Sequence, residues 1–387
     1  MCEDYAMQPG LRQPGSRLPL RVAGCVSLGS PAGWGSVEPA QLIENLCNPS
    51  VYGVGSVRAR LIATQESPFG NLQLAIMSST TLPTSGLRTR ATSLFQDYAE
   101  LIKLRVTSLI VMTAWCGYFF GAHRADVPWL SWGLFHALFG IAMVSSGTAA
   151  LNEVMEHDID GSMRRTALRP LPTGRMSLFH ATAIGLLTSL GGSIYLAVFA
   201  NPLTGLLTLL TSLVYLAAYT PLKRVSPICT FIGAFPGAMP GVLGWTAVRG
   251  QLEWGTLVLF AILFVWQFPH FFSIAWLYRE DYAKGGIKML PVVEEDGRST
   301  AHRILAYSVA LIPISVLPSF MGMAGTIYLV GAVILGAALL YVGMRLAFLN
   351  LPLASAQSKK RARHVLQATV IYLPVLFALM MVNSLKP

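Results

Sequence analysis

The sequence predicts an all-α polytopic membrane protein, with nine transmembrane helices around a central cavity that opens to the cytoplasmic side. Three observations support this fold class. Charged residues make up 12% and hydrophobic residues 53% of the 387 residues, with a mean hydropathy of +0.55, and so few charges cannot cover a water-exposed surface. Apolar segments of about 20 residues recur. Lys and Arg residues gather between alternate segments, which is typical of membrane topology.

Residues 1–90 differ from the rest of the chain. They are rich in Gly, Pro, Ser and Arg and contain no long apolar segment. We expect a disordered leader or a spurious extension, with translation from Met77 as one form of the second alternative. A targeting presequence is a third alternative, because Arg and Ser are common there and acidic residues are few. Residues 91–387 are predicted to form one nine-helix membrane domain.

Nine segments are long enough to cross a hydrocarbon core of roughly 30 Å as helices. Helices are required because lipid cannot satisfy free backbone polar groups. In chain order the predicted spans are 104–122, 130–152, 177–199, 202–220, 226–247, 253–276, 304–322, 325–347 and 365–384. The Gly and Pro residues inside the fifth span are compatible with a membrane helix, where they permit kinks and close packing.

The positions of the basic residues predict how these spans are oriented in the membrane. They precede the first span and follow the second, fourth, sixth and eighth spans, as Arg88, Arg90, Lys103, Arg105, Arg164, Arg165, Arg169, Arg175, Lys223, Arg224, Arg279, Lys284, Lys288, Arg298, Arg303, Arg345, Lys359, Lys360, Arg361 and Arg363. The opposite side carries Arg124, Arg249 and Lys386. The positive-inside rule then places the N-terminus in the cytoplasm and the C-terminus outside. The net charge of +10 is accounted for by this topology, so no nucleic-acid site is predicted.

Acidic residues crowd the cytoplasmic end of the second span. If the helix continues past residue 152, Asn152, Glu156 and Asp160 lie at positions i, i+4 and i+8 on one face. Like charges four residues apart repel unless a cation lies between them, and hard oxygen ligands suit Mg²⁺, which commonly bridges to phosphate oxygens. Arg165 and Arg169 follow, with guanidinium groups suited to phosphate. The pattern predicts either a metal–diphosphate site or a solvated loop whose acids and bases pair with each other.

A second polar cluster follows the sixth span and lies on the same side, because an even number of crossings separates the two. It comprises Tyr278, Arg279, Glu280, Asp281, Tyr282, Lys284 and Lys288. Lys223 and Arg224 end the fourth span on this side, either as further phosphate donors or as ordinary positive-inside anchors. The two clusters are predicted to form opposite walls of one cavity.

His270 lies inside the sixth span, where an ionisable residue is a functional hypothesis by default. It belongs to the segment Trp266-Gln267-x-Pro269-His270-Phe271. Two interpretations remain open for it: contact with an acidic or iron-bearing ligand, and a hydrogen bond across helices.

Together these motifs resemble the protoheme IX farnesyltransferases, the heme O synthases of the intramembrane prenyltransferase superfamily. The resemblance covers roughly residues 92–385. The segments that carry it are Asn152-x3-Glu156-His157-Asp158-Ile159-Asp160-x2-Met163-x-Arg165-Thr166-x2-Arg169-Pro170, Tyr219-Thr220-Pro221-Leu222-Lys223-Arg224, Trp266-Gln267-x-Pro269-His270-Phe271 and Asp281-Tyr282-x3-Gly286-Ile287-x-Met289-Leu290-Pro291. The first is typical of the superfamily, and the last two of the heme branch.

The resemblance implies transfer of the farnesyl group of farnesyl diphosphate to a vinyl group of protoheme IX (heme B), which gives heme O. It implies Mg²⁺ as cofactor. The residues implied are Asn152, Glu156 and Asp160 for the metal, Asp281 or Glu280 in assistance, Arg165, Arg169, Lys223, Arg224 and Lys284 for the diphosphate, and Trp266 and His270 for the heme. The alternatives are prenyl transfer to an aromatic quinone or chlorophyll precursor, and a non-catalytic membrane heme carrier.

The resemblance also implies a location and partners. We expect the bacterial cytoplasmic membrane, or the mitochondrial inner membrane in a eukaryote, and expect heme A synthase and assembly factors of terminal oxidases as partners. Three departures from the family pattern stand out. Glu156 replaces a frequent Asp, His157 replaces a common Arg, and Tyr278 and Tyr282 stand where the superfamily has its second pair of Asp residues. The residues that would hold a second Mg²⁺ are therefore not evident from the sequence.

Overall fold

A computed structural model describes residues 86–348 and 353–385, with side chains described from Leu94 onward. The expected leader lies outside the described residues as far as residue 85 and stays a prediction, as do the positions of the Arg88, Arg90 and Lys386 side chains. Within the described ranges the chain is helical, apart from turns and one isolated β-bridge between Ala324 and Ser384.

Nine helices of the described residues are long and apolar enough to cross a membrane, which confirms the predicted spans. They are α3 (Leu104–Ala125), α4 (Trp132–Asp160), α5 (Leu178–Phe199), the continuous segment of α6 (Pro202–Leu213), η1 (Val214–Tyr219) and α7 (Thr220–Leu222), then α8 (Cys229–Arg249), α9 (Trp254–Leu277), α12 (Arg298–Phe320), α13 (Thr326–Ala347) and α14 (Ala356–Val382). Three shorter helices are α2 (Gly86–Leu101), α10 (Arg279–Lys284) and α11 (Leu290–Val293).

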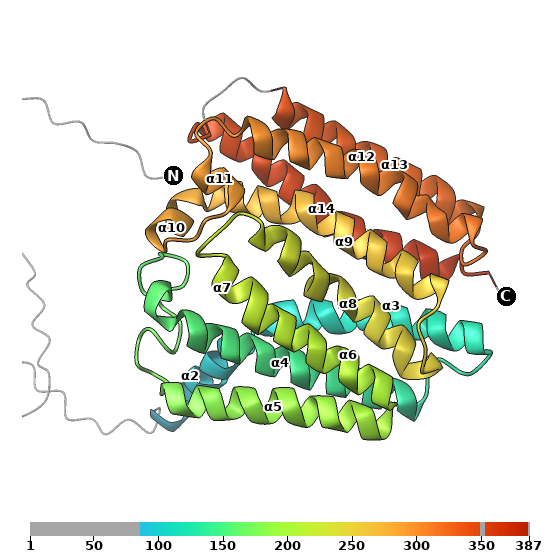
Figure 1. Ribbon diagram of the computed structural model, residues 1–387, viewed down its shortest axis with the longest axis horizontal. Coiled ribbons are helices and arrows are strands. Elements are labelled where there is room, and N and C mark those ends of the chain that lie inside the picture. The colour runs from blue at the N-terminus through green and yellow to red at the C-terminus, as the bar shows by residue number, and fades with distance from the viewer. Residues whose placement is uncertain (1–85, 349–352, 386–387) are drawn as a thin grey trace, which may run out of the picture. The chain divides into compact units, whose positions relative to one another are not determined.

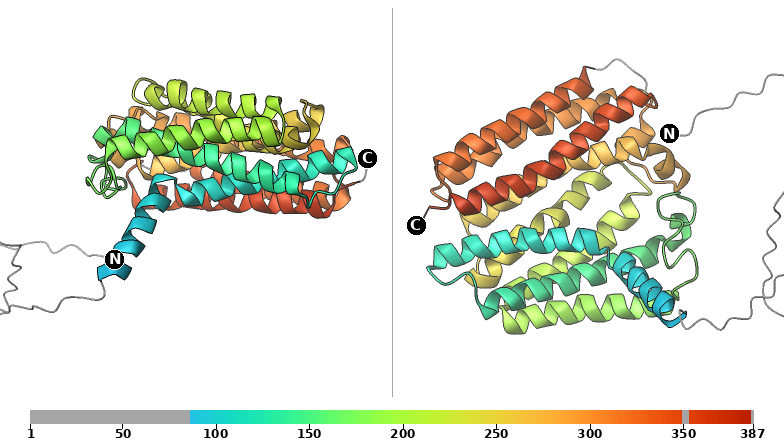
Figure 2. Two further views of the ribbon diagram at one scale, coloured as in Figure 1. Left: turned by 90° about the horizontal axis from the view of Figure 1, so that it is seen from below. Right: turned by 180° about the vertical axis from the view of Figure 1, so that it is seen from behind.

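The spanning helices run side by side in Figure 1 and in both views of Figure 2. Neighbours along the chain pack together in the pairs α4–α5, α5–α6 and α12–α13, while α3–α8, α9–α12 and α9–α14 join more distant segments. Three predicted boundaries change most. Helix α4 continues past residue 152 to Asp160. Helices α12 and α14 begin at Arg298 and Ala356 rather than at residues 304 and 365, because their first turns are polar and precede the apolar stretch.

Helices α3 and α8 approach each other at glycine residues. A Cβ atom on Gly117 would lie 1.9 Å from the carbonyl oxygen of Gly241, and one on Gly244 would lie 1.8 Å from that of Ala114. Small residues allow this backbone contact, which is how membrane helices gain packing energy where lipid supplies no hydrophobic driving force. The contact holds α3 against α8. Lys103, which precedes the first residue of α3, belongs to the site described below.

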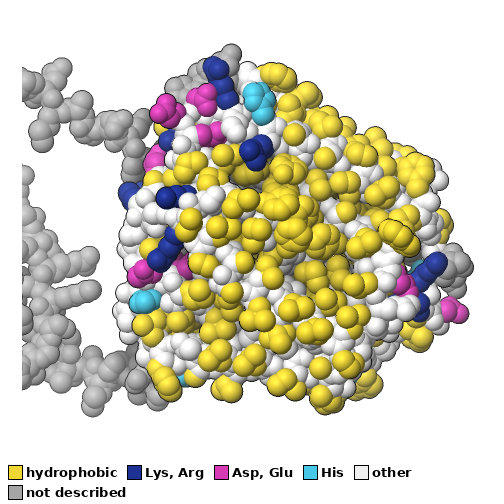
Figure 3. Space-filling model, viewed as in Figure 1, with side chains coloured by type: hydrophobic (Ala, Val, Ile, Leu, Met, Phe, Trp, Pro, Cys, Tyr) yellow, Lys and Arg dark blue, Asp and Glu magenta, His cyan; other side chains and the backbone are white. Residues whose placement is uncertain are grey.

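The two ends of the bundle differ in polarity. We call the end where α4 and α9 terminate, at Asp160 and Leu277, the site end, and the end where α8 terminates and α9 begins the far end. Charged side chains gather at the site end in Figure 3, a smaller group lies at the far end, and the surface between them is mainly apolar. An apolar surface between two polar ends matches a bilayer-spanning protein.

Candidate functional site

The continuation of α4 places a stripe of polar side chains inside the protein at the site end. Asn152, Glu156 and Asp160 are 1%, 5% and 1% exposed, and Glu153 beside them is 1% exposed. The i, i+4, i+8 spacing predicted this stripe, and the structure confirms that the three side chains share a buried face. Burying charges in this way is unfavourable unless partners compensate them.

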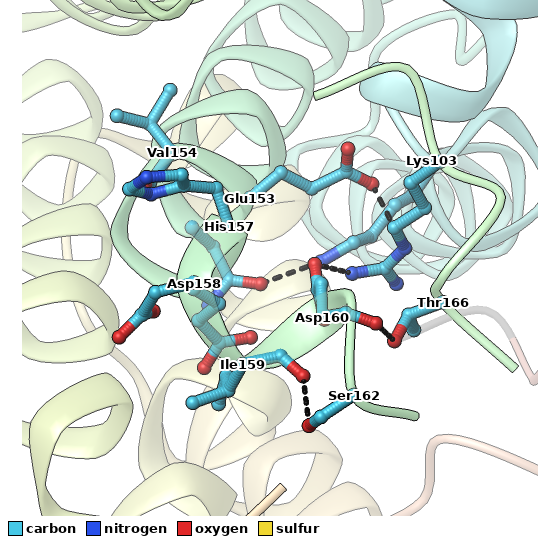
Figure 4. A network of polar contacts seen from close by, with 12 residues as sticks. Lys103, Glu153, Val154, His157, Asp158, Ile159, Asp160, Ser162 and Thr166 are labelled. Carbon is cyan, nitrogen blue, oxygen red and sulfur yellow. Dashed lines mark hydrogen bonds and ion pairs between the residues drawn. The ribbon is translucent and has the colours of Figure 1, made fainter. Parts of the chain in front are cut away.

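Basic side chains from outside the membrane spans compensate these carboxylates. Arg169 Nη1 donates to Asp160 Oδ2 at 2.6 Å, and Arg169 Nε lies 3.4 Å from Glu153 Oε1. Lys223 Nζ forms an ion pair with Glu156 Oε1. Acids and bases therefore pair with each other, as in the alternative interpretation, but the carboxylates lie on a buried helix face and not in a solvated loop. Figure 4 shows the contacts around Lys103, Glu153 and Asp160.

Lys103 joins this group from the corner between α2 and α3. Its Nζ donates to Asn152 Oδ1 at 2.6 Å, and Asn152 Nδ2 in turn donates to Thr220 Oγ1 at 3.2 Å. Burial, together with the positive charge of Arg169, lowers the pKa of Lys103 to about 8. Burial lowers the pKa of Arg169, but the negative charges of Glu153 and Asp160 have a larger effect. The pKa of Arg169 is therefore raised above its ordinary value.

A π-helical turn positions Thr220. The turn η1 spans Val214–Tyr219, and the Thr220 hydroxyl donates to the carbonyl oxygen of Tyr215 at 2.9 Å. Pro221 follows and has no N–H to donate, which favours a local departure from α-helical bonding. Such turns are frequent at functional sites, and here the turn brings a hydroxyl against the stripe on α4.

Several carboxylate oxygens in the stripe lack a hydrogen-bond donor. Both oxygens of Glu153, Oε1 of Glu156 and Oδ1 of Asp160 are buried without a hydrogen-bond partner in the structure, although Glu153 and Glu156 are ion-paired at Oε1. Among the described residues, no three His, Cys, Asp or Glu side chains are placed to hold a metal by themselves. Mg²⁺ commonly binds one or two carboxylates and completes its shell with water and phosphate oxygens, so Asp160 Oδ1, which has no hydrogen-bond partner, and the Asn152 amide fit it.

The second polar cluster contributes aromatic rings to the site end, where they lie against a cation that follows α4. The Arg165 guanidinium lies over the ring of Tyr278, 5.7 Å from its centroid, and over that of Tyr282 at 5.6 Å. Burial raises the pKa of Tyr282, opposed in part by Arg165, so its phenol stays neutral at pH 7. The two tyrosines that replace the second Asp pair therefore hold a cation instead of offering carboxylates.

Other predicted site residues lie nearer the surface. Arg224 pairs with the exposed Asp158 at 2.6 Å, and Glu280 pairs with Lys359 of α14 at 2.9 Å. The side chains of Asp281 and Lys284 take part in no ion pair or hydrogen bond found among the described residues, although the Lys284 carbonyl accepts from Ser162 Oγ at 3.4 Å. The structure thus brings together Asn152, Glu156, Asp160, Arg169 and Lys223, while Arg224 and Glu280 have separate partners.

Trp266 and His270 face α14, and both contact Thr369. Trp266 Nε1 donates to the carbonyl oxygen of Thr369 at 2.9 Å, and His270 Nδ1 lies 3.0 Å from Thr369 Oγ1. Their rings stack with centroids 4.8 Å apart. The interpretation of His270 as a partner in a hydrogen bond across helices is confirmed, and contact with an iron-bearing ligand stays a prediction.

Three residues of the group were not predicted as site residues: Lys103, Glu153 and Thr220. Lys103 was assigned only to membrane topology, Glu153 lies off the i, i+4 stripe, and Thr220 is polar but uncharged. The sequence did contain a signal for Glu153. It is a third acidic residue in the last turns of the helix, and a buried acidic residue requires a cationic partner. No local pattern indicates that Lys103 turns inward.

The described residues thus form a polytopic helical membrane protein with buried carboxylates, an amide and cations at one end of the bundle. Residues 110–366 match the UbiA prenyltransferase family model, and the chain belongs to this family. It is 58% identical over 307 residues to protoheme IX farnesyltransferase of Koribacter versatilis, covering 79% of this chain and 99% of that protein. It is 46% identical over 295 residues to the enzyme of the same name from Solibacter usitatus, covering 74% and 98%.

Solved structures share the fold. One, described as digeranylgeranylglyceryl phosphate synthase in membranes, superimposes with a TM-score of 0.58 at 20% identity and covers 75% of this chain and 98% of that one. A UbiA homologue from Aeropyrum pernix K1 gives a TM-score of 0.51 at 19% identity, covering 69% and 97%. The nine-helix architecture is thus that of the family.

Proposed function

We propose that the protein transfers the farnesyl group of farnesyl diphosphate to a vinyl group of protoheme IX, giving heme O. The observation that carries the proposal is the buried stripe of Asn152, Glu156 and Asp160 on α4, which Lys103, Lys223 and Arg169 contact and where Asp160 Oδ1 has no hydrogen-bond partner. The relatives named protoheme IX farnesyltransferase, at up to 58% identity, support the choice of donor and acceptor.

Asn152, Glu156 and Asp160 would hold Mg²⁺ against the diphosphate. Bound there, the ion would neutralise charge on the leaving group as a Lewis acid. The oxygens that lack donors support this role, and a diphosphate would supply the remaining ligands. Glu153 lies next to Asn152 in the chain. Its oxygens would accept hydrogen bonds from those basic side chains that do not contact the substrate.

Arg169, Lys223 and Lys103 would bind and orient the phosphate oxygens. Each of them contacts the α4 stripe in this structure, so substrate binding exchanges these contacts for phosphate contacts. The C–O bond of the donor then breaks as pyrophosphate leaves, and the vinyl group forms a C–C bond to the farnesyl carbon. Water adds to the resulting cation and loses a proton, which gives the hydroxyethylfarnesyl group. Fixed charges that need little rearrangement lower the barrier to such a charge separation.

Trp266 and His270 are the proposed heme contacts. Both lie in α9 within the apolar part of the bundle, and Thr369 fixes their rings. A fixed pair of stacked rings is suited to a planar acceptor, and an apolar surrounding excludes water from the cation.

The protein is proposed to lie in the bacterial cytoplasmic membrane with its site end in the cytoplasm and its C-terminus outside. The basic residues at the site end support this orientation. Its product would pass to a heme A synthase or to assembly factors of a terminal oxidase.

The test supplies purified protein with farnesyl diphosphate and, in separate reactions, heme B, hydroxybenzoate or chlorophyllide. We expect a farnesylated heme by mass spectrometry, with one pyrophosphate released per heme O formed. A farnesylated aromatic product would establish the second acceptor class. Heme binding without pyrophosphate release would establish a carrier.

A further inference from the structure

The backbone at Lys103 turns the chain from the end of α2 into α3. Lys103 is the N-cap of α3, yet its φ and ψ angles are 48° and 52°, in the left-handed region. N-cap residues normally adopt extended angles and are Ser, Thr, Asp or Asn, whose side chains accept from the first turn. Lys103 makes no such cap hydrogen bond. A non-glycine residue in the left-handed region is strained, and such strain concentrates at functional sites.

The strained corner directs a cation into the site. Lys103 Nζ donates to Asn152 Oδ1 at 2.6 Å, and the neighbouring charges that act on it are Arg169, Glu153, Lys223 and Glu156. The backbone before it is also closed by a turn, because the Lys103 N–H donates to the carbonyl oxygen of Glu100 at 2.9 Å. An extended N-cap conformation would change the direction of the side chain at this position.

The other end of the same helix provides a comparison. Asp126 is the C-cap of α3 and, with Lys103, is one of two non-glycine residues with positive φ in the described part of the chain. A left-handed residue after a helix C-terminus is common, and the Asp126 N–H bonds to the carbonyl oxygen of His123 at 3.3 Å. At Asp126 the conformation ends α3, and at Lys103 it ends α2, but only Lys103 also precedes a further helix directly and sends its side chain into the site.

We propose that Lys103 is a substrate-site residue, whose ammonium group holds Asn152 in this structure and donates to a phosphate oxygen of the bound diphosphate. This rests on the proposed function. The left-handed corner ends α2 and, at the same residue, brings the ammonium group to the α4 stripe. Glycine fits the corner better than lysine but carries no ammonium group.

The test compares Lys103→Gly, Lys103→Ala and Lys103→Arg in the purified full-length protein, with Asp126→Gly and Asp126→Ala as controls. We measure thermal unfolding, the Kd for inorganic pyrophosphate with Mg²⁺, and kcat/KM for heme farnesylation. Lys103→Gly and Lys103→Ala should both lose roughly 10- to 100-fold in pyrophosphate affinity and kcat/KM, as expected for a charged hydrogen bond. Lys103→Arg should recover most of the affinity.

Stability should follow a different order. Each glycine variant should have a Tm about 2 °C above its alanine counterpart, because glycine removes the left-handed strain. Asp126→Gly should keep the activity of the wild type. A Lys103→Gly protein with wild-type pyrophosphate affinity would overturn the proposal, as would one less stable than Lys103→Ala. If the wild type binds pyrophosphate but farnesylates no heme, the proposed function fails while the affinities still decide the role of Lys103.

Discussion

The charged groups at the site end and those at the far end differ in how they are paired. At the far end Arg249 and Glu253 form an i,i+4 pair at 2.7 Å, their side chains are 26% and 21% exposed, and Glu253 also completes a capping box for α9. At the site end the contacts join residues distant in sequence, such as Lys103 and Asn152, in the interior. Local exposed pairs add little to stability, whereas buried pairs carry a large desolvation penalty. This penalty at the site end supports the proposed role of its charges in binding.

The two ends also differ in the side chains that line their interior. A cavity of about 790 Å³ at the far end is lined mainly by apolar and aromatic side chains, including Phe120, Trp245 and Trp254. At the site end, side chains of opposite charge contact one another across the stripe on α4. The predicted cytoplasmic opening of the central cavity stays a prediction, since substrate binding would have to separate these pairs.

The largest expected effect comes from neutralising the stripe. Glu156→Gln and Asp160→Asn keep the side-chain shape but remove the charge, so each should lower kcat/KM for heme farnesylation by roughly 10²- to 10³-fold. The measurement is Mg²⁺-dependent conversion of heme B to heme O. Near wild-type turnover in both variants would contradict the role of the stripe.

Removal of Arg169 should act on stability as well as activity. Arg169→Gln leaves Asp160 and Glu153 buried without their guanidinium partner, which should lower the free energy of unfolding by about 3 kcal/mol. Denaturation of the purified protein measures this. The matched control is Arg249→Gln at the far end, and an equal loss in both variants would remove the distinction between the two ends.

A smaller effect is expected from the rings around Arg165. The double variant Tyr278→Leu/Tyr282→Leu removes both cation–π contacts and should raise KM for farnesyl diphosphate roughly tenfold, because each contact contributes about 0.5–1 kcal/mol. Tyr278→Phe/Tyr282→Phe keeps both rings and should stay within about twofold of the wild type. If the Phe and Leu pairs gave the same KM, the rings would have no part in holding Arg165.

The smallest effect is expected from the far-end pair itself. Arg249→Gln/Glu253→Gln should change the free energy of unfolding by about 0.5 kcal/mol, as for other half-exposed pairs, and leave turnover unchanged. Thermal unfolding and heme conversion measure the two quantities. A large loss of turnover would give the far end a role in the reaction.

The fold could be predicted from sequence because its signals are local. Each membrane span is a run of apolar residues long enough to cross a bilayer, and each of the nine runs is a continuous helical segment in the described part of the chain. The stripe on α4 was also predictable, since a period of four along a helix fixes a common face. The contacts that Lys103 and Thr220 make with Asn152 were not, because they join segments distant in sequence.

Residue types alone could not assign partners. Lys103 and Lys223 fit the positive-inside pattern equally well before the structure showed both at the stripe. Similarly, Tyr278 and Tyr282 appeared only as a loss of carboxylates, whereas the structure places Arg165 over both rings. Such roles depend on which distant segments lie together in the fold, and the spacing of residues along the chain does not show this.

The central claim is that the α4 stripe binds a diphosphate together with a divalent cation. Calorimetric titration of purified wild-type protein and Asp160→Asn with farnesyl diphosphate, with and without Mg²⁺, tests it most directly. We predict tight binding by the wild type that weakens at least tenfold without Mg²⁺, and binding by Asp160→Asn that is weak and insensitive to Mg²⁺. Equal affinity of both proteins with the same Mg²⁺ dependence would contradict the account.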